Sequence, residues 1–140
     1  SLKAGSSTLA FSIDTGFTKQ KIDPAKGYLL ASVVSNGVTL DQRVFYFRKP
    51  KDLILPKAKP VFSLDSSGTV LSINSKVLIK NLGLLANGND QFELNYFDIL
   101  PGAESRIQLP AGIAGKEIKL EAEFLNDKKG INTFEILKTK

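Results

Sequence analysis

Short stretches in which apolar and polar residues alternate recur along most of this chain. The clearest is EIKLEAEF at residues 117–124, where apolar residues occupy every even position and charged residues every odd one. Alternation with a period of two is typical of a β-strand that buries one face. The same reasoning predicts further strands at 61–64, 69–73, 76–86, 105–109 and 132–137. No segment shows a convincing 3.6-residue helical period, so the pattern predicts an all-β protein, an antiparallel β-sandwich.

The N-terminal region holds fewer strands than a sandwich needs. Strands are predicted at 8–13, 28–35 and 38–48. Asn36-Gly37 between the last two is the strongest short hairpin signal in the chain. Because a sandwich usually has about six to nine strands, we interpret residues 1–48 as the last strands of a truncated second sandwich. Its strand edges and apolar face are expected to pack on the second domain or on another copy of the chain.

Residues 49–60, KPKDLILPKAKP, are predicted to link this region to a C-terminal domain at 61–140. The prolines keep the linker extended. Leu53, Ile54 and Leu55 form a short apolar patch within it, which is expected to dock against a neighbouring domain. The lysines of the linker invite a guess about polyanion binding, but a solvated charge run is the favoured interpretation.

The stretch at 91–104, QFELNYFDILPGAE, changes its pattern midway. Its first residues alternate, which predicts a half-buried strand, and 96–100 are apolar at both parities apart from Asp98. The strand is therefore expected either to be covered on both faces or to bulge and change sheet. Pro101-Gly102 then supplies the fixed φ and the positive φ that a type II turn needs.

Two polar side chains of this stretch are candidates for function. Asp98 stands alone among apolar residues, as a carboxyl with a shifted pKa at a site would. Aspartate beside a turn also commonly accepts backbone N–H groups, and this structural role is favoured for Asp98. Asn95 is likewise expected to satisfy backbone groups rather than to bind a sugar.

Composition excludes most kinds of catalysis. The chain has no Cys and no His, which removes thiolate nucleophiles, disulfides and the commonest base and metal ligand. Its net charge of +5 comes mainly from scattered lysines, so a solvated basic surface is favoured over nucleic-acid binding. No targeting signal and no membrane span is predicted. The chain begins at Ser1 and contains no Met, so we expect it to be a piece of a longer protein.

The remaining candidate sites favour structural interpretations. Glu117, Glu121 and Glu123 share one face of a predicted strand, where paired carboxylates suit glycoside hydrolysis, but their alternation with lysine is typical of a solvated face. Asn87-Gly88-Asn89-Asp90 lacks the spacing of a calcium loop and is predicted to be a turn. We expect no catalytic residue, no metal and no cofactor.

The tyrosines are the only candidates for stacking on a sugar ring, because the chain contains no Trp. Tyr28, Tyr46 and Tyr96 each lie among apolar neighbours, so core packing is favoured for all three. Of the three, Tyr96 is the candidate for a sugar contact.

Two segments together resemble the C-terminal region of the β-mannosidases of glycoside hydrolase family 2. They are FYFRKPKDLILPK at 45–57 and FELNYFDILPGAE at 92–104, with NSKVLIKNLGL at 74–84 similar to the strand that precedes the second motif. The family pattern is Phe-x-x-Asn-Phe-Phe-Asp-Leu-Leu-Pro-Gly-Glu. The motif positions are Phe92, Asn95, Tyr96, Phe97, Asp98, Ile99, Leu100, Pro101, Gly102 and, one residue late, Glu104. The departures are Tyr96 for Phe, Ile99 for Leu and an inserted Ala103, which leave the turn intact.

The resemblance implies an accessory immunoglobulin-like sandwich rather than a catalytic domain. In such enzymes the catalytic glutamates lie in a preceding (β/α)₈ barrel, so none is carried onto this chain. The implied partners are the remaining domains of the parent enzyme, with self-association through the N-terminal region as a further expectation. Such enzymes in carbohydrate-degrading bacteria are often exported, which implies a periplasmic or secreted parent.

Two other functions are left open by the sequence. One is a carbohydrate-binding module, which needs an exposed aromatic platform. The other is a cell-surface adhesion sandwich with a protein partner, for which the parent gene would lack a barrel.

Overall fold

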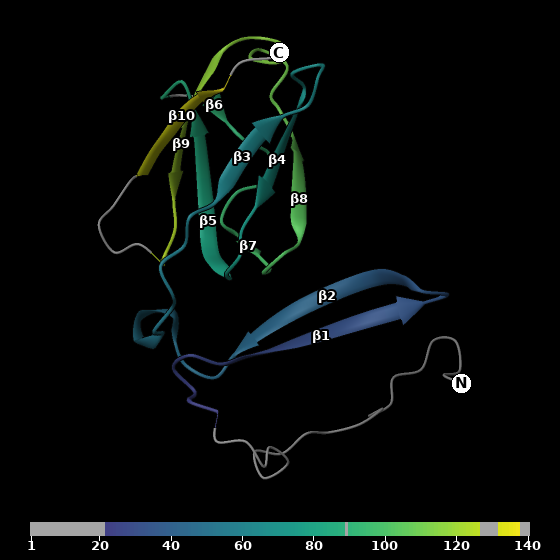
Figure 1. Ribbon diagram of the computed structural model, residues 1–140, viewed down its shortest axis with the longest axis vertical. Coiled ribbons are helices and arrows are strands. Elements are labelled where there is room, and N and C mark those ends of the chain that lie inside the picture. The colour runs from purple at the N-terminus through teal and green to yellow at the C-terminus, as the bar shows by residue number, and fades with distance from the viewer. Residues whose placement is uncertain (1–21, 89, 127–131, 138–140) are drawn as a thin grey trace. The chain divides into compact units, whose positions relative to one another are not determined.

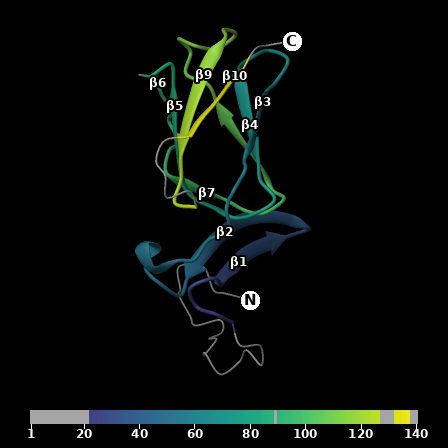
Figure 2. The ribbon, with the colours of Figure 1, turned by 60° about the vertical axis from the view of Figure 1, so that its left-hand side comes forward.

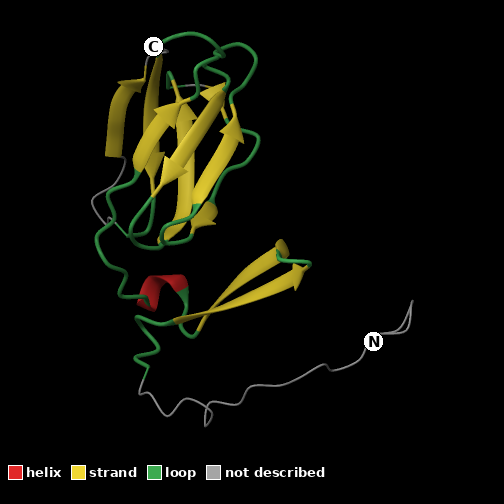
Figure 3. Cartoon of the chain, turned by 45° about the vertical axis from the view of Figure 1, so that its right-hand side comes forward, coloured by secondary structure: helices red, strands yellow, loops and turns green. Residues whose placement is uncertain are grey.

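A computed structural model describes residues 22–88, 90–126 and 132–137, and these form two compact units divided between Lys49 and Pro50 (Figure 1). The described secondary structure is β-strand apart from one short 3-10 turn, η1 (Pro50–Asp52), as the cartoon shows (Figure 3). All strand pairs are antiparallel, which confirms the predicted all-β class. In the described part of the chain, no helix has the length and hydrophobicity to cross a membrane.

The first unit contains a long two-stranded hairpin, β1 (Tyr28–Ser35) and β2 (Val38–Tyr46). Its turn residues Asn36 and Gly37 have φ angles of 51° and 77°. Two successive positive φ angles define a type I′ turn, whose twist suits a hairpin, so the prediction from the Asn-Gly pair is confirmed. The predicted strand at 8–13 lies outside the described residues.

Large apolar side chains of this hairpin and its flanks are exposed to solvent. They belong to both strands and to both residue parities: Ile22, Leu29, Leu30, Val33, Val34, Val38, Leu40, Phe45 and Phe47. An isolated hairpin is only marginally stable in water, because two strands cannot bury an apolar face by themselves. The first unit therefore presents an apolar surface of the kind that marks interaction sites.

The second unit is built from two antiparallel sheets. One has the order β10 (Asn132–Leu137), β9 (Ile118–Glu123), β5 (Ile79–Ala86) and β6 (Asp90–Gln91), with β7 (Phe97–Ile99) also paired to β5. The other has the order β3 (Val61–Leu64), β4 (Val70–Asn74) and β8 (Glu104–Gln108). In Figure 2, β3 and β4 of this second sheet lie to the right of β5 and β9, an arrangement consistent with a β-sandwich.

A single apolar cluster fills the space between these sheets. Leu71 and Ile73 of β4 contribute from one sheet, and Leu82 of β5 and Leu120 of β9 from the other. All four side chains are fully buried. The even positions of 117–124 are all in this cluster, which confirms that the alternation there marks one buried face. The loop that follows β8 adds Ile113 to the core.

The strand predicted at 91–100 is interrupted. Its two ends form β6 and β7, which pair with different parts of β5. The residues between them are not in a strand, and the expected alternation is wrong because Phe92 is buried while Leu94 is half exposed. Of the alternatives left open by the sequence, the break in pairing is closer to a bulge than to a strand covered on both faces.

The β3–β4 turn is organised by the carboxylate of Asp65. One carboxylate oxygen accepts the backbone N–H groups of Thr69 and Val70 at 2.8 and 3.0 Å, and the other accepts the Ser67 hydroxyl at 2.7 Å. The Ser67 hydroxyl is the largest influence on the pKa of Asp65, followed by the Val70 N–H, and together the bonds lower that pKa from 3.8 to about 2. The turn is therefore held best when Asp65 is ionised.

We expect the stability of the second unit to depend on pH through Asp65. Its pKa is lower in the folded chain than in the unfolded one, so its contribution is complete above the unfolded pKa and is lost as the pH falls towards about 2. Urea unfolding followed by circular dichroism at several pH values measures this in the wild type and in Asp65→Asn. The difference in unfolding free energy between them should be constant near neutral pH and shrink between pH 4 and pH 2. A difference that stays constant throughout would contradict the assignment.

Candidate functional site

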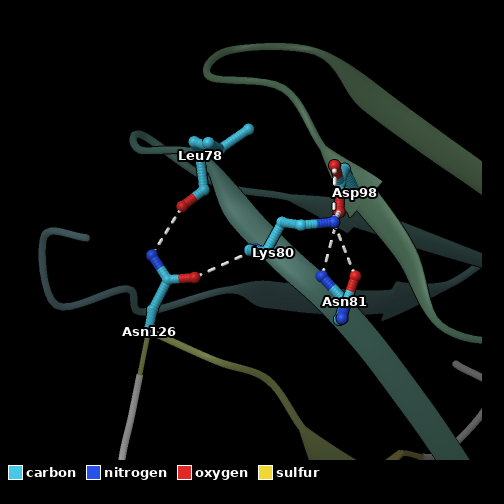
Figure 4. A network of polar contacts seen from close by, with 5 residues as sticks. All are labelled: Leu78, Lys80, Asn81, Asp98 and Asn126. Carbon is cyan, nitrogen blue, oxygen red and sulfur yellow. Dashed lines mark hydrogen bonds and ion pairs between the residues drawn. The ribbon is translucent and has the colours of Figure 1, made fainter. Parts of the chain in front are cut away.

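Asp98 of the 91–104 stretch and Asn126, which follows β9, both bond to a bulge in β5. The register of β5 against β7 shifts between Ile79 and Leu82, and Asn81 within the shift has a φ of 53°. A bulge takes backbone N–H groups out of the regular ladder, and buried ones need other acceptors. Here the side chain of Asn126 accepts the N–H of Lys80 at 2.9 Å, and that of Asp98 accepts the N–H of Asn81 at 2.9 Å (Figure 4).

Asp98 also forms an ion pair across the two strands. The ammonium of Lys80 lies 3.0 Å from Asp98 Oδ1, and their side chains are only 14% and 19% exposed. The same ammonium donates to Asn81 Oδ1. Asp98 thus does accept a backbone N–H group, as predicted, but the donor lies on β5, distant in sequence, rather than in the adjacent turn. A carboxylate that is bonded in this way is a structural group.

Asn126 is a residue that sequence reasoning missed. Its amide nitrogen donates to the carbonyl oxygens of Pro56 and Leu78, at 2.8 and 2.6 Å, while its oxygen accepts from Lys80. It therefore joins the 50–60 segment, the start of β5 and the end of β9. Its hydrogen-bond partners are all remote in sequence, so no local pattern could have indicated its role.

Asn95 replaces a missing strand partner for β5. Its Oδ1 accepts the N–H of Leu84 at 2.6 Å, and its Nδ2 donates to the carbonyl of Leu84 at 2.9 Å. This pair of bonds imitates one link of an antiparallel ladder. Asn95 therefore satisfies backbone groups, the role that the sequence predicted for it.

The other motif residues support the same region. Phe92 is buried in the core and Phe97 packs against it from a half-buried position. In the Pro101-Gly102 turn the N–H of Ala103 bonds to the carbonyl of Leu100, and Gly102 has a φ of 72°. A positive φ at this position confirms the predicted type II turn.

Tyr96 lies on the surface, so the expectation that it packs in the core is wrong. It is 65% exposed, and its φ of 57° is unusual for a bulky residue. Its ring lies over Gly83 of β5, where an added Cβ would come within 3.0 Å of the ring. Its hydroxyl donates to Glu123 at 3.1 Å, and this bond, with the negative charge of Glu123, raises the pKa of Tyr96. The hydroxyl is thus fixed as a neutral donor.

The other two tyrosines belong to the hairpin. Tyr28 and Tyr46 are cross-strand partners, and both are half-buried. Their ring centroids are 6.4 Å apart, a tilted aromatic pair of ordinary geometry.

A hollow of about 480 Å³ surrounds Tyr96 on the outer face of β5 and β9. Glu93, Glu121 and Glu123 contribute carboxylates to its walls, and Leu85 contributes an apolar surface. Glu121 is paired with Lys119 at 3.0 Å. Of the three glutamates noted on the strand, Glu121 and Glu123 meet here, while Glu117 does not line the hollow. An exposed aromatic ring can stack on the face of a sugar ring, and the carboxylates beside it can accept hydrogen bonds from the sugar hydroxyl groups.

The predicted docking patch is divided between interior and surface. Leu53 is 5% exposed and Leu55 half-buried, whereas Ile54 is 59% exposed. Ala58 farther along belongs to the core of the second unit, and the carbonyl of Pro56 is held by Asn126. The segment at 50–60 is therefore part of the second unit.

The predicted turn after β5 contains two left-handed residues. Asn87 and Gly88 have φ angles of 51° and 79°, and Asn89 lies outside the described residues. Asn87 also pairs with β9, since its side chain accepts the N–H of Lys119 at 3.0 Å. Within the ranges that the structure describes, no cluster of three or more acidic residues could hold a metal ion.

Neither a scan against protein-family models nor a search of curated proteins finds a match to this chain.

Replacing Asp98 should destabilise the second unit. Asp98→Ala leaves the Lys80 ammonium and the Asn81 N–H without this partner in a largely buried place, so we expect a loss of about 2 to 4 kcal/mol in unfolding free energy. Asp98→Asn keeps an acceptor for the N–H and should lose less. Chemical unfolding followed by circular dichroism measures both.

The exposed Asp52 provides a matched control, because Asp52→Ala should change the unfolding free energy by less than about 0.5 kcal/mol. Equal effects of Asp98→Ala and Asp52→Ala would show that the bulge does not depend on Asp98.

Proposed function

We propose that this chain is a non-catalytic accessory region of a β-mannosidase-like exoglycosidase, with a role in stability and domain assembly. In this proposal its second unit is an immunoglobulin-like sandwich and its first unit the end of a second sandwich. The parent enzyme hydrolyses terminal β-mannosides and is periplasmic or secreted. The catalytic glutamates belong to another domain of the parent.

The observation that supports the proposal is that polar side chains of the motif form hydrogen bonds to the backbone of their own domain. Asn95 and Asp98 are the two motif side chains that were weighed as polar candidates for function, and both are bonded to the backbone of β5. A motif whose polar groups maintain its own fold serves as a structural signature, as expected of an accessory sandwich.

The exposed hairpin supports the assembly role. An apolar surface on both parities of β1 and β2 is costly to leave in water, so a covering partner is expected. The remaining domains of the parent enzyme are the proposed partner. When those domains are absent, the isolated chain is expected to self-associate through the same apolar surface.

The proposal predicts that the chain alone does not hydrolyse 4-nitrophenyl β-mannoside. Release of nitrophenol should equal that of buffer, with the enzyme encoded by the complete gene as the positive control. Saturable turnover by the chain would contradict the non-catalytic assignment.

The coding sequence upstream of the Ser1 codon is a second test, since it should encode a (β/α)₈ barrel with two catalytic glutamates. A gene without a barrel would favour an adhesion sandwich.

Carbohydrate binding is the second candidate function, because Tyr96 is exposed beside a hollow that also contains Glu93 and Glu123. If it is correct, manno-oligosaccharides should bind at millimolar concentration in a calorimetric or NMR titration, and Tyr96→Ala should weaken binding about tenfold through lost stacking. Tyr28→Ala is the control with an aromatic ring removed elsewhere. No binding at millimolar ligand would remove this candidate.

A further inference from the structure

A second hollow, of about 430 Å³, lies where the segment preceding β3 meets the β4–β5 turn. Lys57, Lys59 and Val61 line it from the first segment, and residues 74–77 line it from the turn. It shares no lining residue with the hollow around Tyr96. Its chemistry is also opposite, because its charged groups are lysines.

The fold holds two of these lysines on the same side of the chain. Ala58 between them is buried in the core, and Pro60 is buried as well. In an extended segment, alternate residues point to the same side and stand about 6 to 7 Å apart. Burial of Ala58 therefore directs Lys57 and Lys59 outward together, where both are exposed.

Lys76 completes the set from the β4–β5 turn. None of the three ammonium groups forms an ion pair with an acid among the residues described, in contrast to Lys80 and Lys119. Three like charges gathered around one hollow repel one another, and an anion between them relieves that repulsion.

Ser75 supplies a separate and independent sign of a ligand. It is a polar residue only 2% exposed, and it lines this hollow. Its Oγ accepts the N–H of Val77 at 3.3 Å, and its carbonyl accepts the N–H of Gly102 at 2.8 Å. Its hydroxyl proton has no acceptor in the described structure. The hydroxyl proton can therefore be donated to an acceptor that enters the hollow.

We propose that this hollow binds an oxyanion, such as a phosphate, sulfate or carboxylate group. The oxyanion accepts the Ser75 hydroxyl proton and is neutralised by Lys57, Lys59 and Lys76. Val61 and Val77 give the hollow apolar walls, which suit an anion carried by a small organic molecule such as a sugar acid. Lysines bind as point charges without a fixed fork, so oxyanions of different shape are accepted.

The proposal is independent of the proposed enzyme family. The sequence predicted solvated linker lysines, and Lys57 and Lys59 are indeed exposed; the structure in addition gathers them with Lys76 from a different segment. The type II turn helps to position Ser75, because the N–H of Gly102 donates a hydrogen bond to the Ser75 carbonyl.

NMR titration of the ¹⁵N-labelled chain with inorganic phosphate, sulfate and trigalacturonate tests the proposal and separates free anions from an anionic sugar. Saturable shifts should be largest at the amides of Ser75 and Val77. Ser75→Ala should weaken binding about tenfold, since it removes a hydrogen bond to a charged group. The triple variant Lys57→Gln, Lys59→Gln and Lys76→Gln should abolish measurable binding.

The triple variant Lys49→Gln, Lys51→Gln and Lys116→Gln is the control, because it removes the same charge from lysines that do not line the hollow. It should bind as the wild type does. Equal losses in the two triple variants, or shifts that never saturate at Ser75, would overturn the proposal in favour of diffuse charge attraction. The lysine comparison decides the question even if Ser75→Ala does not fold.

Discussion

The second unit depends on satisfying the backbone of β5 where its ladder breaks. β5 is the central strand of its sheet and carries several core residues, so its N–H groups are shielded from water along much of its length. Three side chains, those of Asn95, Asp98 and Asn126, stand in for missing strand partners at Leu84, Asn81 and Lys80. Asn95 comes from the β6–β7 connection, Asp98 from β7 and Asn126 from the loop after β9, so the same bonds that complete β5 also fix these segments around it.

Local signals predicted much of this fold. The Asn36-Gly37 and Pro101-Gly102 turns are determined by residues that tolerate positive φ, and both formed as expected. The alternation at 117–124 likewise reflects a burial pattern that a single strand imposes on its own sequence. Predictions of this kind succeed because cause and effect lie within a few residues of each other.

The candidate site was harder to predict because its causes are distant. The break after β6 depends on an amide from Asn95 replacing a strand, and nothing in the alternation of 91–95 indicates that replacement. Tyr96 has a positive φ, which is rare for a tyrosine, so nothing in the local sequence indicated this backbone conformation or the exposed side chain that goes with it. Asn126 bonds to three residues that are far from it in sequence. Only the three-dimensional register brings these groups together.

The contact between Tyr96 and Gly83 links the evolutionary histories of two positions. The ring occupies the space that any Cβ at position 83 would need, and Glu123 Cγ stands 3.1 Å from that point. A Cβ at position 83 would require both the Tyr96 ring and the Glu123 side chain to shift by a few tenths of an ångström, so a large side chain at 96 favours glycine at 83. Among homologous sequences the residues at positions 83 and 96 should covary. Such covariation would show from sequences alone that the segment before β7 crosses β5 at this point.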